Sequence, residues 1–135
     1  MRVQLEKHLS SLKREGVITD WHDRKIGAGK EWENEIDIHL NTSHIILLLI
    51  SPSFMSSNYC WDVELKRAME RHQAQEARVI PVIIEFVDWI NAPFGRLQAL
   101  PEGARPVKEW GNYNKAFLSV AKGIRIVAKE LLEDL

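Results

Sequence analysis

The chain has 135 residues, a length that fits one globular domain with a substantial core. Hydrophobic residues make up 45% of it and charged residues 27%, which excludes a disordered chain. The 18 basic and 19 acidic side chains leave a net charge of −1 and form no basic block, so nucleic acid is not an expected partner. The single cysteine, Cys60, excludes an internal disulfide and fits a reducing compartment.

The sequence shows no targeting or membrane segment. Residues 1–4 lack the apolar run of a signal peptide. The longest apolar stretch, Ile45 to Ile50, is far shorter than the about 20 residues that a membrane helix needs. We therefore expect a cytoplasmic protein with no membrane partner.

The first part of the chain predicts a helix, a strand and a second helix. Apolar residues at helical spacing predict a helix from Val3 to Leu12. A short strand is expected from Val17 to Trp21. Helical spacing returns from Glu31 to Leu40 and predicts the second helix. Its apolar side is formed by Trp32, Ile36 and Leu40.

The middle of the chain predicts two buried strands with a helix between them. Ile45 to Ile50 is apolar without alternation, which is typical of a strand covered on both faces. Asn58 to His72 is amphipathic and predicts a helix. Val79 to Ile84 predicts the second buried strand, in which Pro81 indicates an edge because proline donates no hydrogen bond.

The last part predicts a loop and a long helix. The loop runs from Glu85 to Pro106 and is either functional or contains a short helix, and a brief strand is expected at residues 105–107. The helix spans Asn114 to Leu132, capped by Asn112 or Asn114. The alternation of helices and buried strands predicts one α/β domain, residues 1–135, with a parallel sheet covered on both faces.

Four segments in order resemble the TIR (Toll/interleukin-1 receptor) domain family, most closely its bacterial members. They are Asp20–Asp23, Gly27–Lys30, Ile45–Ser51 and Ser57–Leu65. The last resembles the family motif Ser-x-x-Trp-Cys-x-x-Glu-Leu, although Cys60 and Trp61 stand in the reverse order. The resemblance extends from Leu5 to the C-terminus. It implies a flavodoxin-like parallel sheet of strand order 2-1-3-4-5, with ligand bound at the carboxyl ends of the strands.

The sequence departs from the family at its start. TIR domains begin with a central strand of the type aromatic-Ile-Ser-Tyr, and only residues 1–3 precede the first helix here. Its absence leaves a gap of about 9.6 Å in the expected sheet, which must close. We expect that Val17–Trp21 pairs directly with Ile45–Ile50, that a second chain closes the sheet, or that the chain is a fragment, insoluble or partly molten by itself.

The resemblance implies an enzyme that cleaves NAD+ at the nicotinamide–ribose bond, as a signalling or defence effector. Glu64 is the matching catalytic position, and a carboxylate there suits a transition state with oxocarbenium character. NAD+ is the substrate, and no further cofactor is implied. The alternative is that Glu64 is a solvated residue on a helix surface near Arg67, which the surrounding motif disfavours.

The resemblance also implies substrate-binding positions, namely Trp21, Asp23, Ser51 and Trp61. Trp21 would stack on a flat ring and Asp23 would bond a sugar hydroxyl. The alternatives are core packing for Trp21 and Trp61, and a turn for Asp23. Gly27 and Gly29 give backbone freedom to the loop after the second family strand, which is expected to gate the pocket.

Two other site types find no support in the residue spacing. The segment Gly27–Glu31 fails as a phosphate-binding loop because Lys30 is followed by glutamate. The histidines show no metal-ligand spacing, so no metal is expected. They are His8, His22, His39, His44 and His72.

The alternative function is a non-enzymatic interaction module that signals through self-association with other TIR domains. Its contact surfaces would be the gating loop and the helix that carries Glu64. The missing strand favours this alternative, whereas the bacterial character and Glu64 favour the enzyme. In either case the resemblance implies that the domain is fused to, or works with, a sensor domain.

Overall fold

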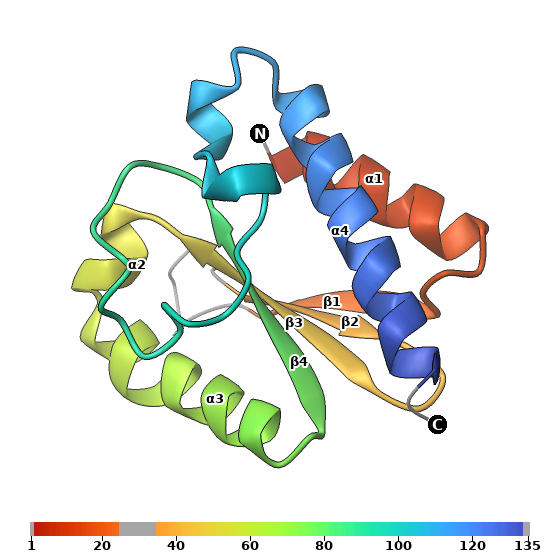
Figure 1. Ribbon diagram of the computed structural model, residues 1–135, viewed down its shortest axis with the longest axis horizontal. Coiled ribbons are helices and arrows are strands. Elements are labelled where there is room, and N and C mark those ends of the chain that lie inside the picture. Colours follow the sequence, from red (N-terminus) through yellow and green to blue (C-terminus); the bar gives the residue numbers. More distant parts are fainter. Residues whose placement is uncertain (1, 25–34, 134–135) are drawn as a thin grey trace.

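The computed structural model describes residues 2–24 and 35–133. Figure 1 shows one sheet with α1 and α4 on one face and α2 and α3 on the other, so the predicted α/β class is confirmed. Along the chain the elements are α1 (Arg2–Arg14), β1 (Asp20–Arg24), β2 (Glu35–His39), β3 (His44–Ile50), α2 (Pro52–Ser56), η1 (Cys60–Leu65), α3 (Lys66–Gln73), β4 (Ala77–Ile83), η2 (Glu102–Ala104), η3 (Val107–Glu109) and α4 (Tyr113–Glu133).

The sheet is mixed, with strand order β1-β2-β3-β4. The pair β3–β4 is parallel, as predicted, and runs from His44 opposite Ala77 to Ile50 opposite Ile83. The pairs β1–β2 and β2–β3 are antiparallel, so the prediction of a wholly parallel sheet of order 2-1-3-4-5 is wrong for this half. The reason is the short connection between β2 and β3, residues 40–43, because parallel neighbours need a crossover of a dozen or more residues.

Strand β2 corrects the prediction of a helix over Glu31–Leu40 in its described part, because residues 31–34 lie outside the described residues. The segment from Glu35 to His39 alternates polar and apolar residues, and the strand places both isoleucines, Ile36 and Ile38, in the core beneath α1 and α4. It lies between β1 and β3, at the position expected for the missing central strand. The expectation that β1 pairs directly with β3 is therefore wrong, because a segment of the same chain separates them.

Two hydrophobic cores cover the two faces of the sheet. One core joins β2, β3 and β4 to α1 and α4, and it includes Leu9, Leu47 and Phe117, each no more than 1% exposed. The other joins β3 and β4 to α2, η1 and α3, and it includes Leu48 and Phe54. Strand β3 contributes to both cores, which confirms the prediction from its unbroken apolar sequence.

The C-terminal part is close to expectation. Strand β4 is an edge of the described sheet, as Pro81 indicated, and the Pro81 carbonyl accepts a hydrogen bond from the Leu100 amide at 2.9 Å. The brief strand expected at residues 105–107 is absent, because Val107 begins the short turn η3. Asn112 Oδ1 caps α4 by accepting from the amides of Asn114 and Lys115. Within residues 2–24 and 35–133, no helix has the length and hydropathy that crossing a membrane requires.

Candidate functional site

Glu64 lies in η1, a turn of π-helix between α2 and α3. Such turns are rare and occur often at functional sites. The Glu64 side chain is buried, with 2% of the residue exposed. Its Oε2 accepts a hydrogen bond from Arg67 Nη2 at 3.2 Å, one helical turn further on. The alternative of a solvated surface residue near Arg67 is therefore only half right. Glu64 does pair with Arg67, but it is buried.

A second buried carboxylate shares the same guanidinium. Glu35, the first residue of β2, is 1% exposed, and its Oε2 lies 3.7 Å from Arg67 Nη2. The Arg67 side chain is 40% exposed and contacts both carboxylates through Nη2. Two buried acids and one arginine thus form a polar centre, which we call the Glu64 centre, defined by Glu35, Glu64 and Arg67.

The Glu64 centre lies toward the carboxyl end of the parallel strands. Glu35 is paired with Leu48, and β3 ends two residues later at Ile50. In open α/β sheets, ligands bind outside the carboxyl ends of the strands. The position of the centre agrees with that rule.

The pairing of arginine and acid continues one turn along α3. Arg71 Nη1 lies 3.4 Å from Asp37 Oδ2, and Asp37 is 6% exposed. Residues four apart on a helix and two apart on a strand share a face. Arg67 and Arg71 therefore lie over Glu35 and Asp37, two acids that were not predicted from the sequence. Two sequence patterns could have indicated these pairs. Residues 35–39 alternate as in a strand, and the helix predicted over residues 58–72 carries two arginines four positions apart.

Three other predicted substrate-binding residues have packing or capping contacts of their own. Trp21 is half-buried and packs with the core beneath α1 and α4, whereas Glu64 lies in η1 on the other face of the sheet. Trp61 packs against the core beneath α2 and α3. Ser51 is 9% exposed and caps α2, its Oγ accepting from the Phe54 amide at 3.2 Å. Each thus has a structural contact of its own.

The predicted loop residues are only partly within the described chain. The backbone of Asp23 belongs to β1 and is paired with Ile36 of β2. Gly27 and Gly29 lie outside the described residues. The gating prediction for these glycines stays a prediction.

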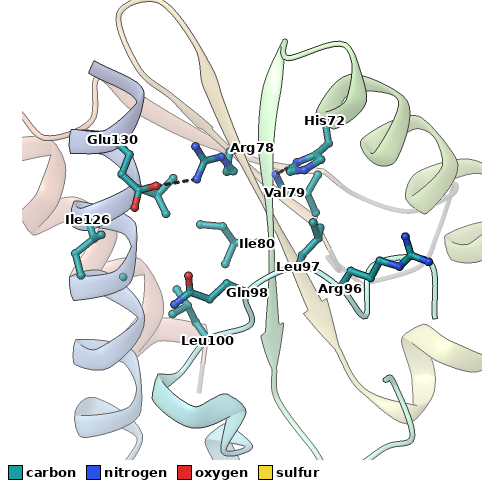
Figure 2. Close-up of a pocket in the computed structure, with 12 residues that line it drawn as sticks. His72, Arg78, Val79, Ile80, Arg96, Leu97, Gln98, Leu100, Ile126 and Glu130 are labelled. Atoms are coloured by element: carbon teal, nitrogen blue, oxygen red, sulfur yellow. Dashed lines mark hydrogen bonds and ion pairs between the residues drawn. The ribbon is translucent and has the colours of Figure 1, made fainter. Parts of the chain in front are cut away.

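A cavity of about 330 Å³ lies elsewhere, between β4 and α4. Figure 2 shows Arg78 and Glu130 paired at one end and His72 close to Val79 at the other. Its lining residues are His72, Arg78, Val79, Ile80, Arg96, Leu97, Gln98, Leu100, Gly123, Ile126, Val127 and Glu130. None of the residues predicted for the site belongs to this lining.

His72 is the titratable group of this cavity with a shifted pKa. Its Nδ1 accepts a hydrogen bond from the Val79 amide at 3.0 Å, at the free edge of β4. Burial of the imidazole, and next the charge of Arg78, lower the pKa of His72 below the ordinary 6.5. The neutral form is the one that accepts from Val79, so the shift and the hydrogen bond agree.

Comparison with known proteins places the chain in a family. The TIR domain family matches residues 4–112. The uncharacterized protein y4lF of Sinorhizobium fredii (strain NBRC 101917 / NGR234) is 54% identical over 128 residues, which cover 95% of this chain. The chain spans 40% of the length of that relative. No solved structure matches the chain. The family match covers most of the chain and includes Glu35, Glu64 and Arg67, so the chain belongs to the TIR domain family.

Proposed function

We propose that this TIR domain cleaves the bond between nicotinamide and ribose in NAD+, acting in the cytoplasm as a signalling or defence effector. The observation that carries the proposal is the burial of the Glu64 carboxylate in a π-helical turn near the carboxyl end of the sheet. A buried ion pair adds little stability compared with apolar packing. A charged group kept in such a place is a candidate for chemistry.

The proposed reaction breaks the bond between ribose C1′ and the pyridinium nitrogen. The bonding electrons move to that nitrogen, neutral nicotinamide leaves, and positive charge develops on the ribose. The Glu64 carboxylate stabilises this charge. Water attacks C1′ and releases a proton to give ADP-ribose, whereas attack by the adenine ring of the same molecule gives a cyclic product.

Arg67 controls access to Glu64 in this proposal. Its guanidinium contacts the Glu64 carboxylate at 3.2 Å, so the substrate must displace it before Glu64 can act. NAD+ carries a diphosphate, and guanidinium groups bind phosphate oxygens strongly. We expect the half-buried Arg67 to exchange the carboxylate for the diphosphate when NAD+ binds. Asp23, Ser51, Trp21 and Trp61 remain proposed substrate contacts.

Nicotinamide release by the purified chain tests the catalytic role. Glu64→Gln keeps the size of the side chain and removes its charge, so we expect it to lower the rate by about 100-fold or more. Glu70→Gln is the matched control, because Glu70 is an exposed glutamate of α3, and its rate should equal that of the wild type. Chromatography of the products measures both. Equal nicotinamide release by wild type and Glu64→Gln would show that the assignment is wrong.

A second candidate function is self-association with other TIR domains. Two exposed apolar side chains favour it, Tyr59 and Val63, which are 43% and 42% exposed and precede Glu64 within five residues. If this surface joins two chains, Val63→Ser should lower the self-association seen by sedimentation, while Ser53→Ala, an exposed change in α2, should not. Cooperation with a sensor domain belongs to the same proposal.

A further inference from the structure

Three potential metal ligands converge at the other end of β2, away from Glu64. They are Asp37 and His39 of β2 and His44 of β3. Asp37 Oδ1 lies 3.0 Å from His44 Nδ1 and 3.9 Å from His39 Nε2. The ligand atoms of all three residues lie within 4.8 Å of one another.

The pairing of the strands explains the convergence. Asp37 and His39 are two residues apart and therefore share a face of β2. His39 is directly opposite His44 in the antiparallel pair. The Leu40 amide donates to the Ser43 carbonyl at 2.9 Å and closes the turn between the two strands. Ligands from two strands are thus held by the backbone, which their sequence spacing alone did not reveal.

The arrangement suits a late first-row metal ion. In tetrahedral coordination with bonds of 2.0–2.2 Å, ligand atoms lie about 3.4 Å apart. The observed separations bracket this value, so small rotations of the side chains would reach it. Imidazole and carboxylate ligands suit Zn²⁺. Asp37 is 6% exposed and both histidines are half-buried, so the ligands are already largely removed from water.

Neighbouring residues complete the site. Arg71 contacts Asp37 through Oδ2 and leaves Oδ1 toward the imidazoles, as a residue that orients a ligand does. Its positive charge opposes a cation, and Glu76, 4.0 Å from Arg71 Nε, partly offsets it. The His22 ring lies against His39, with centroids 4.8 Å apart. His22 is exposed and lies beside His39 at the margin of the site.

We propose that Asp37, His39 and His44 form a binding site for a divalent transition-metal ion of the zinc type, with the fourth position open toward His22. A metal ion there would link β2 to β3 and stabilise the pairing of these two strands. The affinity should be lower than that of closed structural zinc sites, because the site has three protein ligands and a nearby arginine.

Titration of the chelator-treated chain with Zn²⁺, in the absence of NAD+, tests the proposal. We expect one equivalent to bind with a rise in the melting temperature, because the ion binds the folded state. His39→Gln and His44→Gln should each weaken binding at least 10-fold. His8→Gln, in α1, is the matched control and should bind like the wild type. Co²⁺ in place of Zn²⁺ should give the visible absorption of a tetrahedral site with nitrogen and oxygen ligands.

Two results would overturn the proposal. If the wild type binds no Zn²⁺, the three residues form a hydrogen-bonded network only. If His39→Gln binds as tightly as the wild type, the ion binds elsewhere. His39 makes no contact with Asp37 closer than 3.9 Å, so its substitution should leave the fold intact, which circular dichroism would verify. Nicotinamide release plays no part in these measurements, so the site stands or falls independently of the proposed enzyme.

Discussion

The two halves of the sheet use different chemistry to cover the same face. In the half formed by β3 and β4, apolar residues such as Leu48 and Val79 pack beneath α2, η1 and α3. In the half formed by β2, the same face carries Glu35 and Asp37 beneath two arginines of α3. The first half resembles the interior of any α/β protein, whereas the second buries charge. This difference separates the part of this face that packs apolar side chains from the part that carries buried ion pairs.

The other face of the sheet shows no such division. Ile36 and Ile38 of β2 join Ile45 and Leu47 of β3 in one apolar core. Strand β2 therefore has one face for folding and one face for polar contacts. The comparison can be tested by substitutions on each face.

Substitution of an isoleucine on the apolar face should have the largest effect. Ile38 is 0% exposed in the core beneath α1 and α4, so Ile38→Ala should lower the free energy of unfolding by about 3–4 kcal/mol. Leu40→Ala, at a half-buried position, should cost less. A helix over the same segment would reverse the order, because Leu40 would then share the inner side with Ile36. Urea unfolding of the two variants distinguishes strand from helix.

The sequence predicted the apolar half of the sheet more accurately than the polar half. Strands β3 and β4 contain the apolar runs 45–50 and 79–83, and α1 and α4 have one apolar stripe each, so burial determines all four elements. The segment Glu31–Leu40 carries two patterns at once. Trp32, Ile36 and Leu40 have helical spacing, whereas residues 35–39 alternate as in a strand. The segment forms a strand because it can pair with β3 on one side and β1 on the other. The periodicity of the sequence does not show that these pairing partners exist.

The Glu64 centre was only partly predictable for a similar reason. The motif identified Glu64, and the spacing identified Arg67 as its neighbour. Glu35 is 29 positions from Glu64 in the sequence, and only the pairing of β2 with β3 brings it to the same arginine. Contacts of this kind depend on tertiary structure, which local patterns do not specify.

Removing the shared arginine should have an intermediate effect. Arg67→Met leaves the buried Glu35 and Glu64 without their common cation. Loss of one partner of a buried ion pair typically costs about 3–5 kcal/mol. The Arg67 side chain is 40% exposed, so solvent reduces the effect, and we expect about 2 kcal/mol. Chemical denaturation would measure it, with Lys66→Met, an exposed neighbour, as the control.

The same substitution tests whether charge is responsible. Adding Glu35→Gln and Glu64→Gln to Arg67→Met removes the two carboxylates that Arg67 contacts and should recover part of the lost stability. The opposite result is that the two glutamine substitutions lower the stability of Arg67→Met by the sum of their effects in the wild type. That result would show that Arg67→Met loses stability through the packing of the Arg67 side chain. In that case the contrast between the two halves of the sheet would be one of shape and not of charge.

The smallest expected effect concerns His72, which lies at the edge of the apolar half. The unfolded chain protonates His72 near pH 6.5, and the folded protein does so only at lower pH, because burial and Arg78 lower the pKa. Between these two pH values the unfolded state binds more protons, so the stability that neutral His72 contributes is complete above pH 6.5 and is lost as the pH falls through the folded pKa. His72→Asn keeps an acceptor for the Val79 amide and does not titrate. We therefore expect the free energy of unfolding to fall less between pH 7.5 and about pH 5 in His72→Asn than in the wild type, as urea unfolding at the two pH values would measure. An equal fall in wild type and His72→Asn would show that protonation of His72 does not cause the loss of stability at low pH.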